Sequence, residues 1–233
     1  MTLRERIIKI FSPKGGVWFL SPGLVGREEQ EVIQDLEWYA DRFVHAMSGI
    51  EDLSRAYSKA EGDVFNGVLL QIDQDCDDSE GVRRKIIHRI TDQRLFFPDS
   101  RKDMLRLLNS MSLALFHLKG FKTLAVPRKP LDDDEQYVLT EVAITEIKLA
   151  GTLSDAVRYV NEDPMTALEK IEHEYSYQEE VFHWVEELRR IRERNPPSEE
   201  DIRWILFLQQ VIQITQDILG ALNHVQEIAI QYL

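Results

Sequence analysis

The chain has 233 residues, of which 43% are hydrophobic and 30% charged, so it is long enough to bury a core of its own. Its net charge of −13 and pI near 5.0 oppose binding to the phosphate backbone of nucleic acid, and we expect no nucleic-acid partner. Only 11 glycines and 8 prolines interrupt segments rich in Glu, Leu, Arg, Gln and Ile, which favours helix and excludes a mainly β architecture.

The first half of the chain predicts an irregular arm followed by three helices. Residues 1–27 contain closely spaced glycines and prolines that break regular structure. Over residues 28–59, apolar side chains recur every three or four positions, which is the spacing of an amphipathic helix. A second helix is predicted over 63–94 and a third over 100–119, with Gly120 as its C-cap.

The second half predicts the same plan after a proline-containing linker at residues 121–130. A fourth helix is predicted over 131–160 and a fifth over 163–194, with Pro164 at its first position. The stretch NPPSEEDIRWIL then supplies a proline, a serine cap and an acidic residue before the sixth helix, which continues to Leu233.

These elements predict an all-α protein of six long helices in one compact domain. Two sets of three helices follow one another at an offset of about a hundred residues, which indicates an internal duplication. We therefore predict two tandem antiparallel three-helix bundles, at residues 28–120 and 131–233, with the irregular N-terminal arm at 1–27. Short connections within each repeat make neighbouring helices antiparallel.

The junction between the second and third helices carries a family resemblance. It reads EGVRRKIIHRI at residues 80–90 and LFFPDSRKDMLRLL at residues 95–108, and Phe96 and Phe97 are expected to plug the corner. An Arg-Arg-x-Ile-Ile run followed by a Phe/Leu-Pro-x-x-Arg-x-Asp corner resembles the PhoU-related group of phosphate transport regulators. The resemblance implies two three-helix repeats packed side by side.

The resemblance also implies a place for metal. PhoU is associated with metal clusters held by Glu/Asp-x-x-x-Asp pairs on the second and third helices of each repeat, where residues four apart share a helix face. In the first repeat the second-helix positions correspond to Cys76 and Glu80. The third-helix positions correspond to Ser112 and Phe116, and the Phe116 ring is expected to fill the space that a metal would need.

The second repeat keeps one acid in each pair. Its matching positions are Tyr175 with Glu179, and Gln213 with Asp217. Glu80, Glu179 and Asp217 are therefore the only candidate metal ligands of the family type. Since half or more of the charged ligands are replaced, we expect no metal cluster and no cofactor.

No group of residues typical of an enzyme is apparent in the sequence. Glu180-x-x-His183 has the spacing used by di-iron bundles, but the required second Glu-x-x-His pair is missing. No Gly-rich phosphate loop and no nucleophile elbow occurs. We therefore expect a protein that is not an enzyme.

The leading hypothesis, which the resemblance implies, is a non-catalytic accessory or regulatory protein of phosphate transport that binds the cytoplasmic side of a PiT-type phosphate permease. One alternative is a metal-binding PhoU-like protein with a degenerate carboxylate site, and another is a helical scaffold dimer unrelated to phosphate. The single cysteine and the lack of an uninterrupted apolar run of ~18 residues predict a cytoplasmic protein without direct membrane insertion. Aromatic residues on helix faces predict a homodimer.

Overall fold

The structure is a computed structural model. It describes residues 27–92, 98–124, 126, 129–172, 174–192 and 199–231. The predicted irregular arm lies outside these residues except for Arg27, which begins the first helix. The predicted corner at Phe96 and Phe97 also lies outside the described residues.

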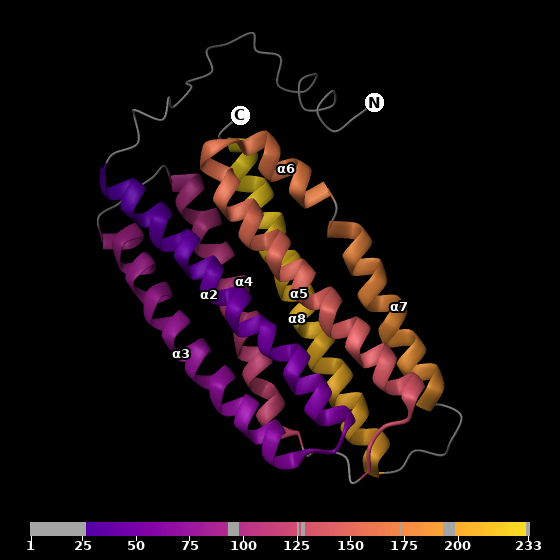
Figure 1. Ribbon diagram of the computed structural model, residues 1–233. Helices are drawn as coiled ribbons and strands as arrows, with labels where there is room; N and C mark the ends of the chain where they lie inside the picture. Colours follow the sequence, from indigo (N-terminus) through magenta and orange to yellow (C-terminus); the bar gives the residue numbers. More distant parts are fainter. Residues whose placement is uncertain are drawn as a thin grey trace, which may run out of the picture.

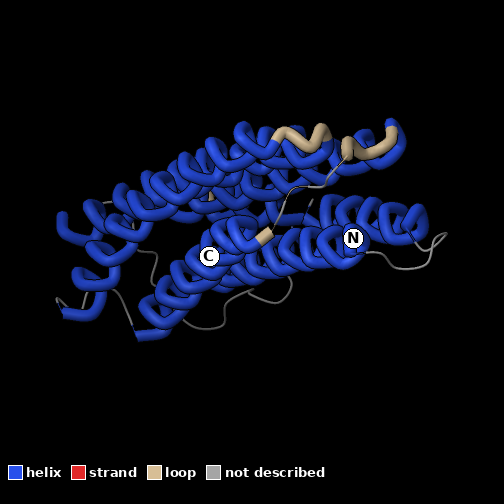
Figure 2. Tube along the Cα trace, turned by 90° about the horizontal axis from the view of Figure 1, so that it is seen from below, coloured by secondary structure: helices blue, strands red, loops and turns tan. Residues whose placement is uncertain are grey.

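The described residues form α-helices and one short 3-10 helix, with no strand among them (Figures 1 and 2). The elements in chain order are α2 (Arg27–Ser58), α3 (Gly62–Asp92), α4 (Pro98–Gly120), η1 (Phe121–Thr123), α5 (Asp133–Glu162), α6 (Pro164–Glu172), α7 (Glu174–Arg192) and α8 (Glu199–Gln231). The prediction of an all-α protein is confirmed. The predicted fifth helix over 163–194 corresponds to α6 and α7, and the one residue between them, residue 173, lies outside the described residues.

Four long helices form the centre of the bundle. Helix α2 packs on α5, α4 packs on α8, and contacts between α5 and α8 and between α2 and α4 close the group. Helix α3 lies outside α2 and α4, and α7 lies outside α5 and α8, so these two helices occupy opposite flanks (Figure 1). Each flanking helix thus completes a three-helix unit, and the two units lie side by side.

Local capping explains where several helices begin. At the start of α5, the Asp132 carboxylate accepts a hydrogen bond of 2.8 Å from the backbone N–H of Glu135, whose carboxylate accepts one of 3.3 Å from the Asp132 N–H. This reciprocal pair satisfies two backbone donors that the helix leaves without partners. At the start of α6, the Asp163 carboxylate accepts from both the backbone N–H and the hydroxyl of Thr166, and Pro164 occupies the first helical position as predicted.

The end of α4 differs from its prediction. Gly120 has a right-handed helical backbone with φ of −59°, so it is not a left-handed C-cap, and the chain continues into η1. A Cβ at Gly120 would lie 2.7 Å from the side-chain oxygen of Gln210 on α8. The glycine is therefore explained by the close approach of α8 and not by the helix ending.

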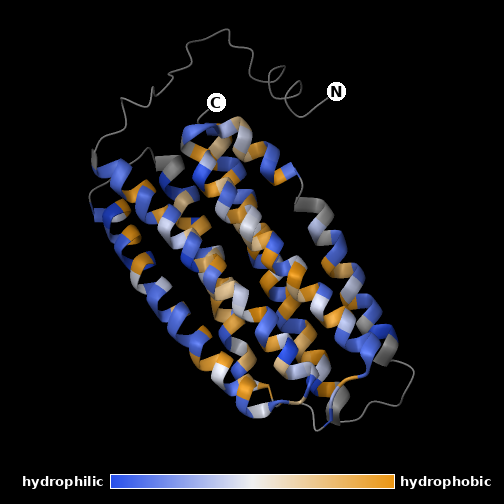
Figure 3. Ribbon diagram, viewed as in Figure 1, coloured by the Kyte–Doolittle hydropathy of each residue, from blue (hydrophilic) through white to orange (hydrophobic). Residues whose placement is uncertain are grey.

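Aromatic side chains fill the core where the ends of several helices meet. We call this cluster the aromatic end: Tyr57, Phe65, Phe121, Trp204 and Phe207, each at most 1% exposed. The ring centroids of Tyr57 and Phe207 are 4.7 Å apart, as are those of Phe121 and Phe207. The cluster ties α2, α3, η1 and α8 together, and large buried rings contribute strongly to stability. Along the helices, Figure 3 shows hydrophobic positions interspersed with hydrophilic ones, as expected for amphipathic helices.

A carboxyl group lies deep between α5 and α8. Glu146 is 0% exposed, and the hydroxyl of Thr215 donates a hydrogen bond to its Oε1 atom. Among the described residues its Oε2 atom has no hydrogen-bond partner. Burial raises the pKa of Glu146 to about 8, because a charged carboxylate is poorly solvated in an apolar core.

Helix α8 is the most apolar of the described helices. Its segment Ile202–Gln231 has a mean hydropathy of 1.3 over its most apolar window, which by length and composition could cross a membrane. Half of that window is buried inside the protein, where α8 packs on α4 and α5. Packing in the core is a sufficient reason for this composition.

Candidate functional site

The three candidate acidic residues lie on three different helices. Glu80 lies on α3, Glu179 on α7 and Asp217 on α8. Since α3 and α7 flank opposite sides of the bundle (Figure 1), the structure does not bring Glu80 and Glu179 together. Within the described part of the chain, no group of three or more His, Cys, Asp or Glu side chains could hold a metal ion.

The Glu80 carboxylate accepts hydrogen bonds from basic neighbours on its own helix. Arg83 donates two hydrogen bonds to the Glu80 carboxylate, at 2.7 and 2.8 Å, and Arg84 donates a third at 3.2 Å. The hydrogen bonds from Arg83 are the main reason that the pKa of Glu80 is lowered. Ser112 on α4 is also close, and its hydroxyl lies 3.4 Å from the Glu80 carboxylate. A polar contact therefore occupies the place of an acidic pair.

Cys76 and Phe116, at the other two matching positions of the first repeat, differ in their exposure to solvent. Cys76 is buried, its Sγ atom lies 3.8 Å from the Leu115 carbonyl oxygen, and burial raises the pKa of its thiol to about 12. The thiolate needed for metal binding or nucleophilic attack is thus disfavoured. Phe116 is 68% exposed, so the prediction that its ring fills a metal space is wrong.

In the second repeat, Asp217 contacts a histidine of the first. Its carboxylate lies 2.7 Å from the Nδ1 atom of His117 on α4, and both side chains are largely buried. Burial raises the pKa of Asp217 by more than the contact with His117 lowers it. Glu179 is exposed on α7, Gln213 is exposed on α8, and the side chain of Tyr175 lies outside those described. The candidate acids of this repeat are therefore apart from one another.

Helices α4 and α8 run antiparallel and share a surface. Asp103 near the start of α4 accepts a 2.7 Å hydrogen bond from Gln231 at the end of α8, whereas Gly120 at the end of α4 approaches Gln210. With the His117–Asp217 contact between them, these pairs fix the register of the two helices. Exposed residues of α4 that are next to these contacts therefore lie beside the corresponding exposed residues of α8.

One part of the exposed surface of α4 and α8 is formed by residues without charge, beside Lys119 and the contact of His117 with Asp217. We call it the uncharged face, and its members are all exposed: Leu113 and Phe116 on α4, and Leu206, Gln209, Gln213 and Gln216 on α8. Thirty per cent of the chain is charged, so an exposed uncharged stripe spanning two helices is unusual for its surface. Exposed apolar side chains gathered in one region are typical of protein-binding sites.

An acidic segment of α3 borders the uncharged face. Asp73 and Asp77 lie 3.5 and 2.7 Å from the Lys119 ammonium, one turn along α4 from Phe116. Asp78, the next acid on α3, is also exposed. This arrangement can provide an apolar contact region with a negatively charged rim, which suits binding and supplies no catalytic group.

Sequence reasoning missed this face because its members come from segments about a hundred residues apart. The stripe Leu113, Phe116 could be found from helical spacing, since apolar residues there fall outside the buried stripe of α4. The contribution of α8 depends on the register of the two helices, which no local pattern contains.

The fold is similar to that of all-helical PhoU-like proteins of known structure. A PhoU-like protein from Shewanella oneidensis MR-1 superposes with a TM-score of 0.66 at 14% identity, covering 84% of this chain and 96% of that one. A candidate PhoU-like phosphate regulatory protein from the same organism gives a TM-score of 0.63 at 14% identity, covering 86% and 96%. No protein-family model and no curated protein sequence matches the chain. The resemblance predicted from the corner motif is therefore confirmed as a shared fold.

Proposed function

We propose that the protein is a non-catalytic regulatory component of phosphate transport that acts by binding the cytoplasmic side of a phosphate permease of the PiT type. The observation that supports this most directly is the PhoU-like fold, which extends over 96% of a structure described as a candidate phosphate regulatory protein. The corner motif Arg83-Arg84 through Asp103 adds a sequence resemblance to the same group.

The uncharged face is the surface that we assign to the permease. Phe116 supplies a large exposed ring, and buried aromatic anchors dominate the affinity of many protein complexes. The acidic rim at Asp73 and Asp77 suits the excess of Lys and Arg in the cytoplasmic loops of membrane proteins, and such complementarity speeds and orients association. The activity is thus binding, and a cytoplasmic location follows from the proposed partner.

Recovery of the permease with tagged protein from membranes of the native host tests this proposal. We expect a phosphate permease to copurify with the parent protein. Phe116→Ser should weaken the complex by about 2 kcal/mol, or roughly thirtyfold, because it removes the anchor. Val64→Ser is the matched control, since Val64 is 51% exposed at the start of α3 and is not a member of the uncharged face. Absence of a permease from the parent sample would refute the proposal.

A further inference from the structure

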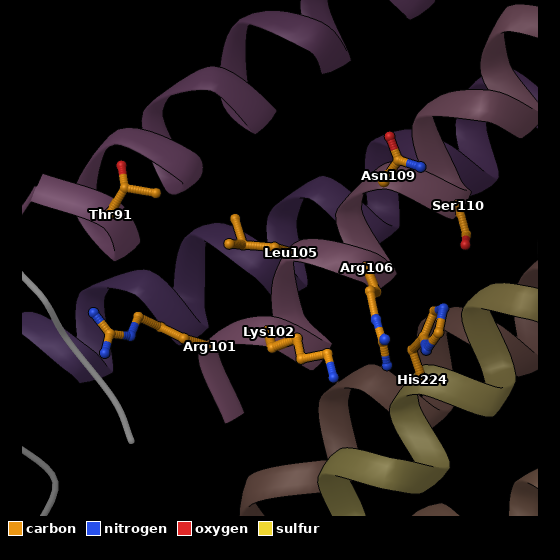
Figure 4. Close-up of a pocket in the computed structure, with 8 residues that line it drawn as sticks. All are labelled: Thr91, Arg101, Lys102, Leu105, Arg106, Asn109, Ser110 and His224. Atoms are coloured by element: carbon orange, nitrogen blue, oxygen red, sulfur yellow. The ribbon is translucent and has the colours of Figure 1, made fainter. Parts of the chain in front are cut away.

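A pocket of about 650 Å³ opens where α3 ends beside the first half of α4 and the last third of α8. Four of its lining residues are basic or can become so: Arg101, Lys102 and Arg106 of α4, and His224 of α8. Figure 4 shows the side chains of Lys102 and Arg106 extending from α4 in the direction of His224, whereas Arg101 lies on the far side of Leu105. No acidic residue is among those that line the pocket.

Two of these cations are partly neutralised from outside the pocket. The guanidinium of Arg106 lies 3.4 Å from the Asp103 carboxylate and 4.0 Å from that of Glu227. The Nδ1 atom of His224 lies 3.1 Å from the same Glu227 carboxylate. Glu227 therefore holds Arg106 and His224 beside each other while it reduces the positive potential that they present.

The other two cations have no such counter-charge. Neither Arg101 nor Lys102 forms an ion pair with any residue that the structure describes, and Lys102 is exposed. Most arginines of the described chain, by contrast, lie within 4 Å of a carboxylate, as Arg55, Arg83 and Arg89 do. In a protein with a net charge of −13, these two uncompensated cations make the pocket a local exception.

Neutral hydrogen-bond donors complete the lining. Thr91 and Ser110 supply hydroxyl groups, and Asn109 supplies an amide. Arg101 and Lys102 lie near the first turn of α4, where the aligned peptide dipoles add partial positive charge. Cations, hydroxyls and an amide around one hollow can donate to several oxygens of a tetrahedral anion at once.

We propose that this pocket binds a phosphate dianion, either as inorganic phosphate or as the phosphate monoester of a lipid headgroup. Phosphate fits better than a carboxylate because it has more acceptor oxygens and about twice the charge, and the forked guanidinium donors match its oxygens in pairs. The inference is independent of the proposed permease binding, since it uses a different half of the α4–α8 surface. It also differs from the known phosphate loops, because its residues come from three helices and no glycine-rich segment is involved.

The double variant Arg101→Gln/Lys102→Gln tests the site in the full chain. Titration calorimetry with inorganic phosphate measures binding of the free anion, and cosedimentation with phosphatidylcholine vesicles containing phosphatidic acid measures binding of the lipid monoester. The matched control is Lys85→Gln/Lys148→Gln, which removes two exposed cations outside the pocket. We expect the pocket variant to lose affinity by about tenfold or more and the control to keep it.

The two measurements separate the sources of the phosphate. Binding of inorganic phosphate that is lost in the pocket variant identifies a site for the free anion. Binding only to vesicles with phosphatidic acid, lost in the same variant, identifies the lipid headgroup as the source. If the parent protein binds neither probe, or if the pocket and control variants lose affinity equally, the proposal is overturned.

A third variant is expected to strengthen phosphate binding instead of weakening it. Glu227→Gln removes the carboxylate that competes for Arg106 and His224, and its side chain is half exposed, so the fold should tolerate the change. We expect the variant to bind the phosphate probe severalfold more tightly than the parent. Weaker or unchanged binding would contradict the placement of the anion beside these two residues.

Discussion

The two ends of the bundle differ in chemistry, although helix α8 contributes side chains to both. At one end lies the aromatic end, whose five rings are nearly inaccessible to solvent. At the other end the contacts are polar, with Asp103 bonded to Gln231 and Glu227 placed beside Arg106 and His224. Buried ring contacts stabilise by several kcal/mol, whereas exposed ion pairs contribute at most about 1 kcal/mol.

The end of the bundle that contributes most to stability is therefore not the end that is accessible to partners. The aromatic end closes the bundle where the ends of four elements meet, so its side chains are inaccessible to partners. The polar end contributes less to stability, and among the described residues it offers no counter-charge to Arg101 and Lys102, which line an open pocket. The uncharged face, outside the aromatic end, adds a second accessible region. The comparison predicts that substitutions inside the bundle change the free energy of unfolding strongly, whereas substitutions on the two exposed surfaces change it little.

The largest expected effect is that of Trp204→Ala at the aromatic end. The Trp204 ring is 1% exposed and its centroid lies 5.6 Å from that of Tyr57, so the change leaves a large cavity. We expect a loss of about 3–5 kcal/mol in the free energy of unfolding, measured by urea denaturation. Trp38→Ala is the control, because Trp38 is 46% exposed and should cost less than about 1 kcal/mol. Equal losses in the two variants would show that the aromatic end does not dominate stability.

The second prediction concerns the buried carboxyl group midway between the two ends. Burial raises the pKa of Glu146 from 4.5 to about 8 in the folded protein. Between these values the unfolded chain releases the proton while the folded chain keeps it, so stability is full below the lower pKa and falls as pH rises toward 8. Glu146→Gln cannot titrate, and it should therefore be more stable than the parent at alkaline pH, by about 2 kcal/mol or more.

Urea denaturation across this pH window measures the effect of Glu146→Gln. Near the lower pKa the variant and the parent should differ by less than about 1 kcal/mol, since both carry a neutral group there. Glu141→Gln is a control on the same helix, where the carboxyl group is partly exposed, and it should keep the pH slope of the parent. A parallel pH dependence in Glu146→Gln and the parent would show that Glu146 is not the titrating group.

The smallest of the three effects belongs to the contact between His117 and Asp217. A double-mutant cycle with His117→Gln and Asp217→Asn should give a coupling energy of about 1 kcal/mol, because both side chains are only partly shielded from water. The same cycle with His88→Gln and Asp217→Asn is the control, since His88 pairs with Asp92 at the exposed end of α3. A coupling of zero in the first cycle would argue against the antiparallel register of α4 and α8.

Most of the secondary structure could be predicted from the sequence, because helix spacing and capping are local. The observed α2 begins and ends within one residue of the predicted 28–59, and Asp163 with Pro164 marks the start of α6 as expected. The cap that Asp132 forms with Glu135 was missed, although an acidic residue three positions after an aspartate is a visible signal.

The candidate site was less accessible to prediction. The matching positions Glu80 and Ser112 lie 3.4 Å apart. The exposure of Phe116 was not predicted, because it depends on how α4 packs against α3. Arg101 and Lys102 form a visible cluster in the sequence, but no local pattern indicates that His224 lies beside them.

The sequence by itself determined that this chain is helical and where most of its helices begin, because hydrophobic periodicity and capping act within a few residues. The PhoU-like plan was implied by the resemblance of the corner motif. Only the tertiary structure decided which helix faces meet. The antiparallel register of α4 and α8 places Asp217 against His117 and His224 beside Arg106. The physical reason is that side-chain packing between helices selects one register among many with similar local energies, so the surfaces that bind partners emerge only when the bundle closes.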